Sequence, residues 1–179
     1  MTPNEILTFW FEEAGSGRWF QKSDAFDAQV RMQFEETVLS LATDVQDWIE
    51  TPEGSLALII ALDQFPRNIY RGTKAAFAFD DKALAYAQAM TDKGWDLKID
   101  QSRRAFVYMP FMHSENLRAQ NECVRLMDMR LDNAHNLHHA KEHRKVIEHF
   151  GRFPHRNEIL GRDSTAEELA FLKAGGYTP

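Results

Sequence analysis

The sequence predicts an all-α protein of about seven or eight helices, packed as antiparallel hairpins in one domain over residues 1–179. Three observations support this fold class. Apolar residues recur at helical spacing in segment after segment, several segments begin with a capping residue followed by proline or glutamate, and no set of segments is typical of pairing strands. Short connections favour antiparallel neighbours, stacked as a helical array or as an irregular bundle.

Local signals mark the first two helices. Thr2 followed by Pro3 predicts a helix whose apolar residues lie between positions 6 and 11 and which stops at the glycines of 15–17. Ser23 or Asp24 caps the second helix. Its apolar face repeats at steps of three and four residues and consists of Phe26, Val30, Phe34, Val38 and Leu41.

The next segment begins at Thr51-Pro52 and becomes apolar on every side over residues 56–62. Periodicity alone fits a buried strand or a buried helix. We predict a helix, because the segment continues into Asp63 and Gln64 and has no partner strand. Pro66 is expected to end it.

The remaining helices follow from caps and breakers. Asp80-Asp81 is expected to cap a helix that Gly94 closes. Pro110 is expected to kink or restart the helix that begins near Arg103. Further helices are predicted over residues 117–129 and 136–150, and from a capping box that begins at Ser164 or Thr165.

Composition excludes several classes of protein. A net charge of −6 argues against general nucleic-acid binding. The single cysteine, Cys123, excludes an internal disulfide and a cysteine-based zinc cage. No segment resembles a signal peptide or a membrane span, so we expect a cytoplasmic protein without a membrane partner. Neither nucleotide-binding glycine motif is present, and no cofactor is predicted.

Two polar strings with a shared pattern are the most informative part of the chain. Residues 63–68 read Asp-Gln-Phe-Pro-Arg-Asn, and residues 150–157 read Phe-Gly-Arg-Phe-Pro-His-Arg-Asn. Both place arginine and asparagine just after Phe-Pro, with His155 as a one-residue insertion in the second. Each string follows an apolar helix, so core packing should hold it in place.

The arginines in and beside these strings have two interpretations. An arginine fork binds carboxylate or phosphate through two parallel hydrogen bonds, so the strings could line one anion pocket. Alternatively, the arginines pair internally with Asp63, Glu115, Glu148 and Glu158. The candidate ligand-binding residues are Asp63, Gln64, Arg67, Asn68, Arg71, Arg104, Ser114, Arg152, His155, Arg156, Asn157 and Arg162.

A catalytic hypothesis rests on His113, Glu115 and His143. An imidazole beside a carboxylate can serve general acid–base chemistry. His113 and Glu115 lie two residues apart, however, and such positions do not face each other on a helix. Each would have to meet a group from elsewhere, such as His143, Arg156 or Asp63.

Histidines at positions 135, 139 and 143 are spaced by four residues and would share one face of a helix. Two histidines four residues apart can bind a divalent metal, but a complete site needs a third ligand, such as Glu142 or Glu115. No glutamate follows the first histidine as in a metalloprotease helix. We therefore predict no metal site.

Four strings together resemble a known family. Residues 9–11, 56–68, 108–115 and 150–157 are similar to a bacterial family known as domain of unknown function 924. The resemblance extends from about Ile6 to Gly176 and departs from the family pattern mainly between Met129 and His139. It implies an all-helical fold similar to tetratricopeptide repeats and brings no established activity.

Three functional hypotheses follow. The first is a helical protein that binds a small or peptide-borne anion. In this hypothesis arginines clamp the anion, hydrogen bonds from amide side chains orient it, and histidines are pH-sensitive donors. The residues are Arg67, Arg152 and Arg156 for the clamp, Asn68, Gln64 and Asn157 for orientation, and His113 and His155 as donors. The second is a hydrolase or transferase that acts on a phosphorylated or carboxylated metabolite, with His113 or His143 as the acid–base group. The third is a scaffold that binds a protein partner. The oligomeric state is left open.

Overall fold

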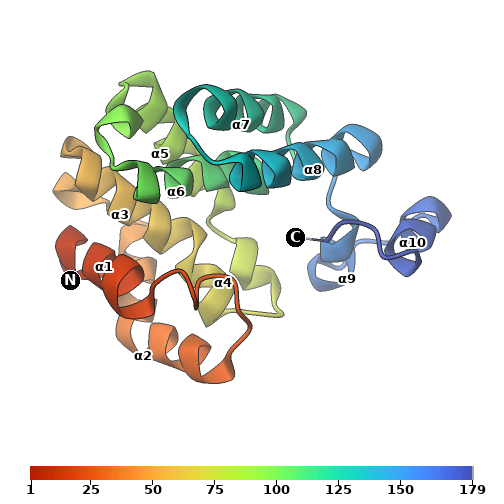
Figure 1. Ribbon diagram of the computed structural model, residues 1–179. Helices are drawn as coiled ribbons and strands as arrows, with labels where there is room; N and C mark the ends of the chain where they lie inside the picture. The colour runs from red at the N-terminus through yellow and green to blue at the C-terminus, as the bar shows by residue number, and fades with distance from the viewer. Residues whose placement is uncertain (179) are drawn as a thin grey trace. The chain divides into compact units, whose positions relative to one another are not determined.

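The computed structural model describes residues 1–178, and within them the chain forms helices and turns but no strand (Figure 1). The prediction of an all-α protein is therefore confirmed. The chain divides into two compact units, of which the first is Met1–Pro110 and the second begins at Phe111. The single domain and the tetratricopeptide-like arrangement stay predictions. Among the described residues, each helix is too short or too polar to cross a membrane.

The first unit is organised around one buried helix, α3, which contacts α1, α2, α4 and α5. In chain order the elements are α1 (Pro3–Thr8), the π-helix η1 (Phe9–Ala14), α2 (Asp24–Leu41), the 3-10 helix η2 (Gln46–Glu50), α3 (Pro52–Asp63), α4 (Phe65–Ile69), the 3-10 helix η3 (Lys74–Phe77), α5 (Asp80–Asp92), the 3-10 helix η4 (Trp95–Lys98) and α6 (Gln101–His113).

Side-chain caps explain where three of these helices begin. The Thr2 hydroxyl accepts a hydrogen bond from the Glu5 amide, and the Glu5 carboxylate accepts one from the Thr2 amide, which forms a complete capping box. Ser23, rather than the alternative Asp24, caps α2. Thr51 caps α3, as predicted.

The core of the first unit joins α3 to a cluster of aromatic rings. Residues 56–62 are almost fully buried, which confirms that the apolar segment is a helix rather than a strand. Phe34 packs against Phe9 and Phe65, with both pairs of ring centroids 4.6 Å apart. Trp10 contacts Phe65 at 5.6 Å. The phenylalanine of the first Phe-Pro string is thus fixed inside the core.

The second unit pairs two long helices and adds a short C-terminal arm. Its elements after α6 are α7 (Leu117–Arg130), α8 (Ala134–Phe150), the 3-10 helix η5 (Pro154–Arg156), α9 (Asn157–Leu160) and α10 (Ala166–Lys173). Val146, Ile147 and Phe153 form a buried cluster on which Phe171 and Tyr177 pack.

Cys123 on α7 belongs to the interior of the second unit. Its side chain is fully buried, and this burial raises the pKa of the thiol. A buried thiol with a raised pKa behaves as a small apolar side chain, because the thiolate is the reactive form.

Three sequence signals act differently from expectation. α3 already ends at Asp63, and Pro66 lies in the first turn of α4, where its missing N–H costs nothing. The Asp80 carboxylate binds Arg67 instead of capping α5, whose N-cap is Phe79. α6 continues through Pro110, although the boundary between the two units falls at that residue.

Gly54→Ala is expected to destabilise the first unit. A Cβ at this position would lie 2.3 Å from the backbone oxygen of Trp48 and 2.9 Å from the Thr51 hydroxyl. Overpacking of this kind costs about 1–3 kcal/mol of unfolding free energy. Gly17→Ala is the matched control, because a Cβ there would meet no atom within 4 Å. Urea unfolding followed by circular dichroism tests this, and equal midpoints for the two variants would contradict it.

Candidate functional site

The first Phe-Pro string forms a closed polar network on the first unit. Arg67 donates to both carboxylate oxygens of Asp80, at 3.0 and 3.1 Å, and to the backbone oxygen of Asp63. The fully buried Asp63 carboxylate accepts from Gln64 at 2.5 Å and lies 3.4 Å from Arg67. Asp63, Gln64 and Arg67 therefore satisfy one another and tie the end of α3 to the start of α5.

The next residues of this string bind α2. Asn68 donates to Asp27 at 2.8 Å, and Arg71 makes a two-pronged contact with the same carboxylate at 2.5 and 2.9 Å. Burial raises the pKa of Asp27, but the hydrogen bonds from Arg71 and Asn68 outweigh this effect and lower the pKa on balance. Asp27 is thus an ionised anchor for the segment that follows α4.

Arg104 and Ser114 have local structural contacts. The buried Arg104 guanidinium donates to the backbone oxygen of Ile99 at 2.9 Å and to that of Leu97 at 3.4 Å, which holds the start of α6 against η4. The Ser114 hydroxyl accepts from the Asn116 amide at 3.3 Å, in the turn between α6 and α7.

The second Phe-Pro string is held by two carboxylates from other segments. Arg152 makes a two-pronged contact with Glu168 of α10, at 2.6 and 2.8 Å, and Arg162 makes one with Glu115, at 2.6 and 2.9 Å. The hydrogen bonds from Arg152 are the main reason why the pKa of Glu168 falls to about 2. Asn157 donates to Glu168 at 3.2 Å and accepts from Arg162 at 3.0 Å.

Glu115 has a second structural contact, because its carboxylate accepts from the Phe153 amide at 2.7 Å. Burial raises the pKa of Glu115, but the hydrogen bonds from Arg162 and from Phe153 lower it on balance. Several of these arginines therefore make internal ion pairs. Asp63 and Glu115 are among the partners, as the sequence suggests. The other carboxylate partners are Asp27, Asp80 and Glu168, where the sequence suggested Glu148 and Glu158.

The remaining candidate residues of the second unit lie around the ring of Phe153. The His143 and His155 rings each lie 5.7 Å from it, and the Arg156 guanidinium lies over its face at 4.5 Å. His113, at the end of α6, lies 6.4 Å from the His143 ring. Three separate segments thus bring His113, His143, His155 and Arg156 together, and we call these four residues the Phe153 cluster.

Burial keeps two of these imidazoles neutral. Desolvation lowers the pKa of His143 to about 3, and desolvation followed by the charge of Arg156 lowers that of His155 to about 4. Nδ1 of His143 lies 2.8 Å from the backbone oxygen of His139, a geometry that requires Nδ1 to carry the proton. Nδ1 of His155 is buried and has no hydrogen-bond partner among the described residues.

The remaining histidines of α8 contact the C-terminal segment. The Tyr177 hydroxyl lies 2.7 Å from Nδ1 of His139 and 3.3 Å from Nδ1 of His143, and burial raises the pKa of Tyr177 to about 12. Within residues 1–178, no three His, Cys, Asp or Glu side chains are grouped so that they could hold a metal ion. His135 and His139 stack edge to face at 4.4 Å.

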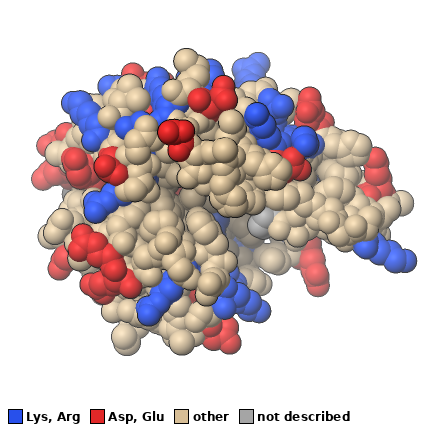
Figure 2. All heavy atoms as spheres, in the orientation of Figure 1, with Lys and Arg blue, Asp and Glu red and all other residues tan. Residues whose placement is uncertain are grey.

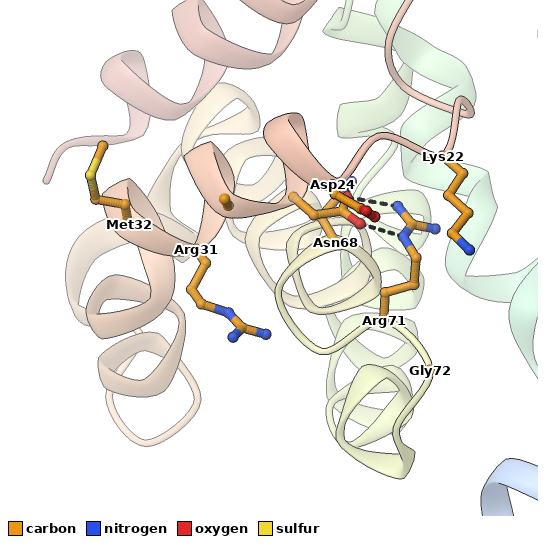
Figure 3. A pocket seen from close by; sticks show the side chains of 9 residues that line it. Lys22, Asp24, Arg31, Met32, Asn68, Arg71 and Gly72 are labelled. Atoms are coloured by element: carbon orange, nitrogen blue, oxygen red, sulfur yellow. Dashed lines mark hydrogen bonds and ion pairs between the residues drawn. The ribbon is translucent and has the colours of Figure 1, made fainter.

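A pocket of about 540 Å³ lies on the first unit between α2 and the segment that follows α4 (Figure 3). Arg71 and Asn68 were candidates from the sequence. Lys22 and Arg31, which line the pocket with them, were not, because they lie outside the Phe-Pro strings. The one available signal was their closeness in sequence to the Asp27 carboxylate, since Lys22 lies just before α2 and Arg31 lies four residues after Asp27 on α2.

The architecture and these contacts define an all-helical protein with networks of arginine–carboxylate contacts at two Phe-Pro segments. The chain belongs to the bacterial protein family of unknown function DUF924, whose model matches residues 6–176. It is similar to the solved structure of a protein of unknown function from Agrobacterium tumefaciens, with 40% sequence identity, 97% of each chain covered and a TM-score of 0.91. No curated protein matched the chain. The family resemblance is therefore confirmed.

Acidification from pH 7 to pH 5 is expected to lower the unfolding free energy. The pKa of His143 is about 3 in the folded state, compared with 6.5 for a free imidazole. Between these values the unfolded chain binds a proton that the folded chain does not. The contribution is therefore complete above pH 6.5 and is lost as the pH falls, by up to about 1.4 kcal/mol per pH unit.

Urea unfolding at several pH values measures this slope. His143→Phe should make it shallower, whereas His138→Gln, at an exposed position of the same helix, should leave it unchanged. His155, whose pKa is about 4, contributes to the same slope, whereas Glu115 and Glu168 have lowered pKa values and contribute only at more acidic pH. A slope in His143→Phe equal to that of the unmodified protein would show that His143 does not contribute to it.

Proposed function

We propose that the protein binds a small anion, phosphorylated or carboxylated, at the Phe153 cluster. The observation that carries the proposal is the buried Nδ1 of His155, which has no hydrogen-bond partner among the described residues and lies next to a buried arginine. Buried polar atoms are nearly always satisfied by protein, water or ligand. A ligand oxygen would satisfy this nitrogen.

The other arginines of the candidate set have structural contacts. Arg67, Arg152 and Arg162 each make two-pronged contacts with a carboxylate, and Arg104 serves backbone oxygens. Their principal role is to fix the segments on which the candidate site is built. Arg156 lies over the ring of Phe153, and its charge influences both His143 and His155.

Electrostatics favour a local site. The whole chain carries a net charge of −6, and on the face drawn in Figure 2 acidic and basic side chains are interspersed. Long-range attraction of anions is therefore weak, and affinity would have to come from short, directed hydrogen bonds. A buried guanidinium, and the neutral imidazole of His155 in the tautomer that carries its proton on Nδ1, provide such donors in an environment of low dielectric constant.

The pKa values support binding over acid–base catalysis. A general base works best when its pKa lies near the operating pH. Burial places the pKa values of His143 and His155 far below neutrality, and the carboxylate of Glu115 is engaged by Arg162. A neutral imidazole is better suited to orienting a ligand: His155 through an N–H, and His143 as a fixed neighbour whose own N–H binds the backbone oxygen of His139. The enzymatic and scaffold alternatives, and a cytoplasmic location, stay predictions.

Thermal-shift screening against phosphorylated and carboxylated compounds tests the proposal. A compound present at one hundred times its dissociation constant should stabilise the protein by about 2.7 kcal/mol. His155→Ala and Arg156→Lys should each reduce this shift, because the first removes a donor and the second removes the planar fork. Arg118→Ala, at an exposed position of α7, should retain it.

Two outcomes would contradict the proposal. One is the absence of a shift with every compound of the panel. The other is a shift of unchanged size in both His155→Ala and Arg156→Lys, since His155 can be removed without breaking any hydrogen bond among the described residues. Loss of folding in Arg156→Lys alone would leave His155→Ala as the deciding variant.

A further inference from the structure

The pocket on the first unit has a cationic lining that the function proposed above does not use. Its volume of about 540 Å³ is within the usual range for small-molecule sites. Three basic and two acidic residues line it, in a chain whose acidic residues outnumber its basic ones. The full lining consists of Lys22, Asp24, Asp27, Ala28, Arg31, Met32, Asn68, Arg71 and Gly72.

Arg71 lines this pocket and is fixed on one side by Asp27. Its Nε donates to one oxygen of Asp27 at 2.5 Å, and one Nη2 hydrogen donates to the other oxygen at 2.9 Å. The second Nη2 hydrogen and both Nη1 hydrogens have no partner among the described residues, and the side chain remains 37% exposed. A guanidinium fixed on one side loses little further entropy when its other side binds an oxyanion.

Two more cations face the same space. Lys22 is exposed and makes no hydrogen bond or ion pair with any other described residue. Arg31 donates through Nη2 to the backbone oxygen of Ile69, which orients the side chain without neutralising its charge. In Figure 3 the cationic ends of Lys22 and Arg71 point toward the same side of the pocket, and Arg31 extends from α2 on the other side of Asn68.

The charges within the pocket do not balance. Asp27 offsets Arg71, and Asp24 attracts Arg71 from the first turn of α2. One positive charge remains in excess, and like charges that share a concave surface repel one another. Independent solvation of Lys22 and Arg31 is the simplest structural explanation. Solvation accounts for the exposure of these side chains. It does not explain why Arg31 is fixed by a backbone oxygen, which does not neutralise its charge, or why Arg71 is fixed on one side only.

We propose that this pocket is a second anion site, which takes a small molecule through a phosphate group. In this site Arg71 provides the fork, Arg31 adds charge from α2, and Lys22 adds charge from the segment just before α2. Asp27 stays bound to the far side of Arg71 and sets its orientation. The site lies on the first unit and shares no residue with the Phe153 cluster, so either site can exist without the other.

Amide NMR spectra recorded during titration with inorganic pyrophosphate at low ionic strength test this site. The expected result for this site is saturable shifts at residues 22–32 and 68–72, which are followed separately from any shifts at the Phe153 cluster. Lys22→Ala and Arg31→Ala should each weaken binding by about fivefold to tenfold, close to 1.4 kcal/mol at the upper end. Added salt should weaken it further. Lys141→Ala, at an exposed position of α8, should leave the dissociation constant measured at these residues unchanged.

The same titration can overturn the proposal. Pyrophosphate shifts spread over exposed lysines and arginines of the whole chain would indicate a diffuse ion atmosphere and no site. An unchanged dissociation constant in the double variant Lys22→Ala with Arg31→Ala would show that the pocket cations do not bind the anion. Acetate that binds as tightly as pyrophosphate would overturn the assignment of a phosphate group.

Discussion

The buried ring of Phe153 is the contact on which the second unit most depends. It packs with Val146 and Ile147 in the core and at the same time has His143 and Arg156 against its edge and face. Its backbone amide is bound by Glu115. One residue therefore couples apolar packing to the placement of the polar side chains. The side chains of the Phe153 cluster are thus held by the core of the second unit. Such support gives a site the rigidity that directed hydrogen bonding requires.

The two Phe-Pro segments use the same physical arrangement in different surroundings. Phe65 and Phe153 are both fully buried. Near them, Arg67 binds the Asp80 carboxylate of α5 and Arg152 binds the Glu168 carboxylate of α10. A buried aromatic side chain fixes the position of each segment, and two-pronged ion pairs fix its orientation. The segments differ in their surroundings. The first places part of Arg71 at a pocket, and the second places His143, His155 and Arg156 around the buried ring of Phe153.

Helix positions were largely predictable from the sequence, because caps and apolar periodicity act over a few residues. Thr51 and the buried segment after it show this most clearly. The π-helical turn at Phe9–Ala14 was not predictable, since its hydrogen-bond register depends on packing. The sequence marked the arginines of both segments but identified only some of their partners. Asp27 and Asp80 are separated from Arg71 and Arg67 by 44 and 13 residues, and pairing at such distances is decided by tertiary structure. Lys22 and Arg31 carried no motif and became candidates only through the pocket.

The burial of Cys123 has a practical consequence for studying the second unit. The thiol is the single one in the chain, it is fully buried, and its raised pKa suppresses the thiolate. A thiol-specific reagent can therefore modify the protein only when α7 separates from its neighbours. The labelling rate of the unmodified chain would report how often this unit opens, and a ligand that binds there would slow it.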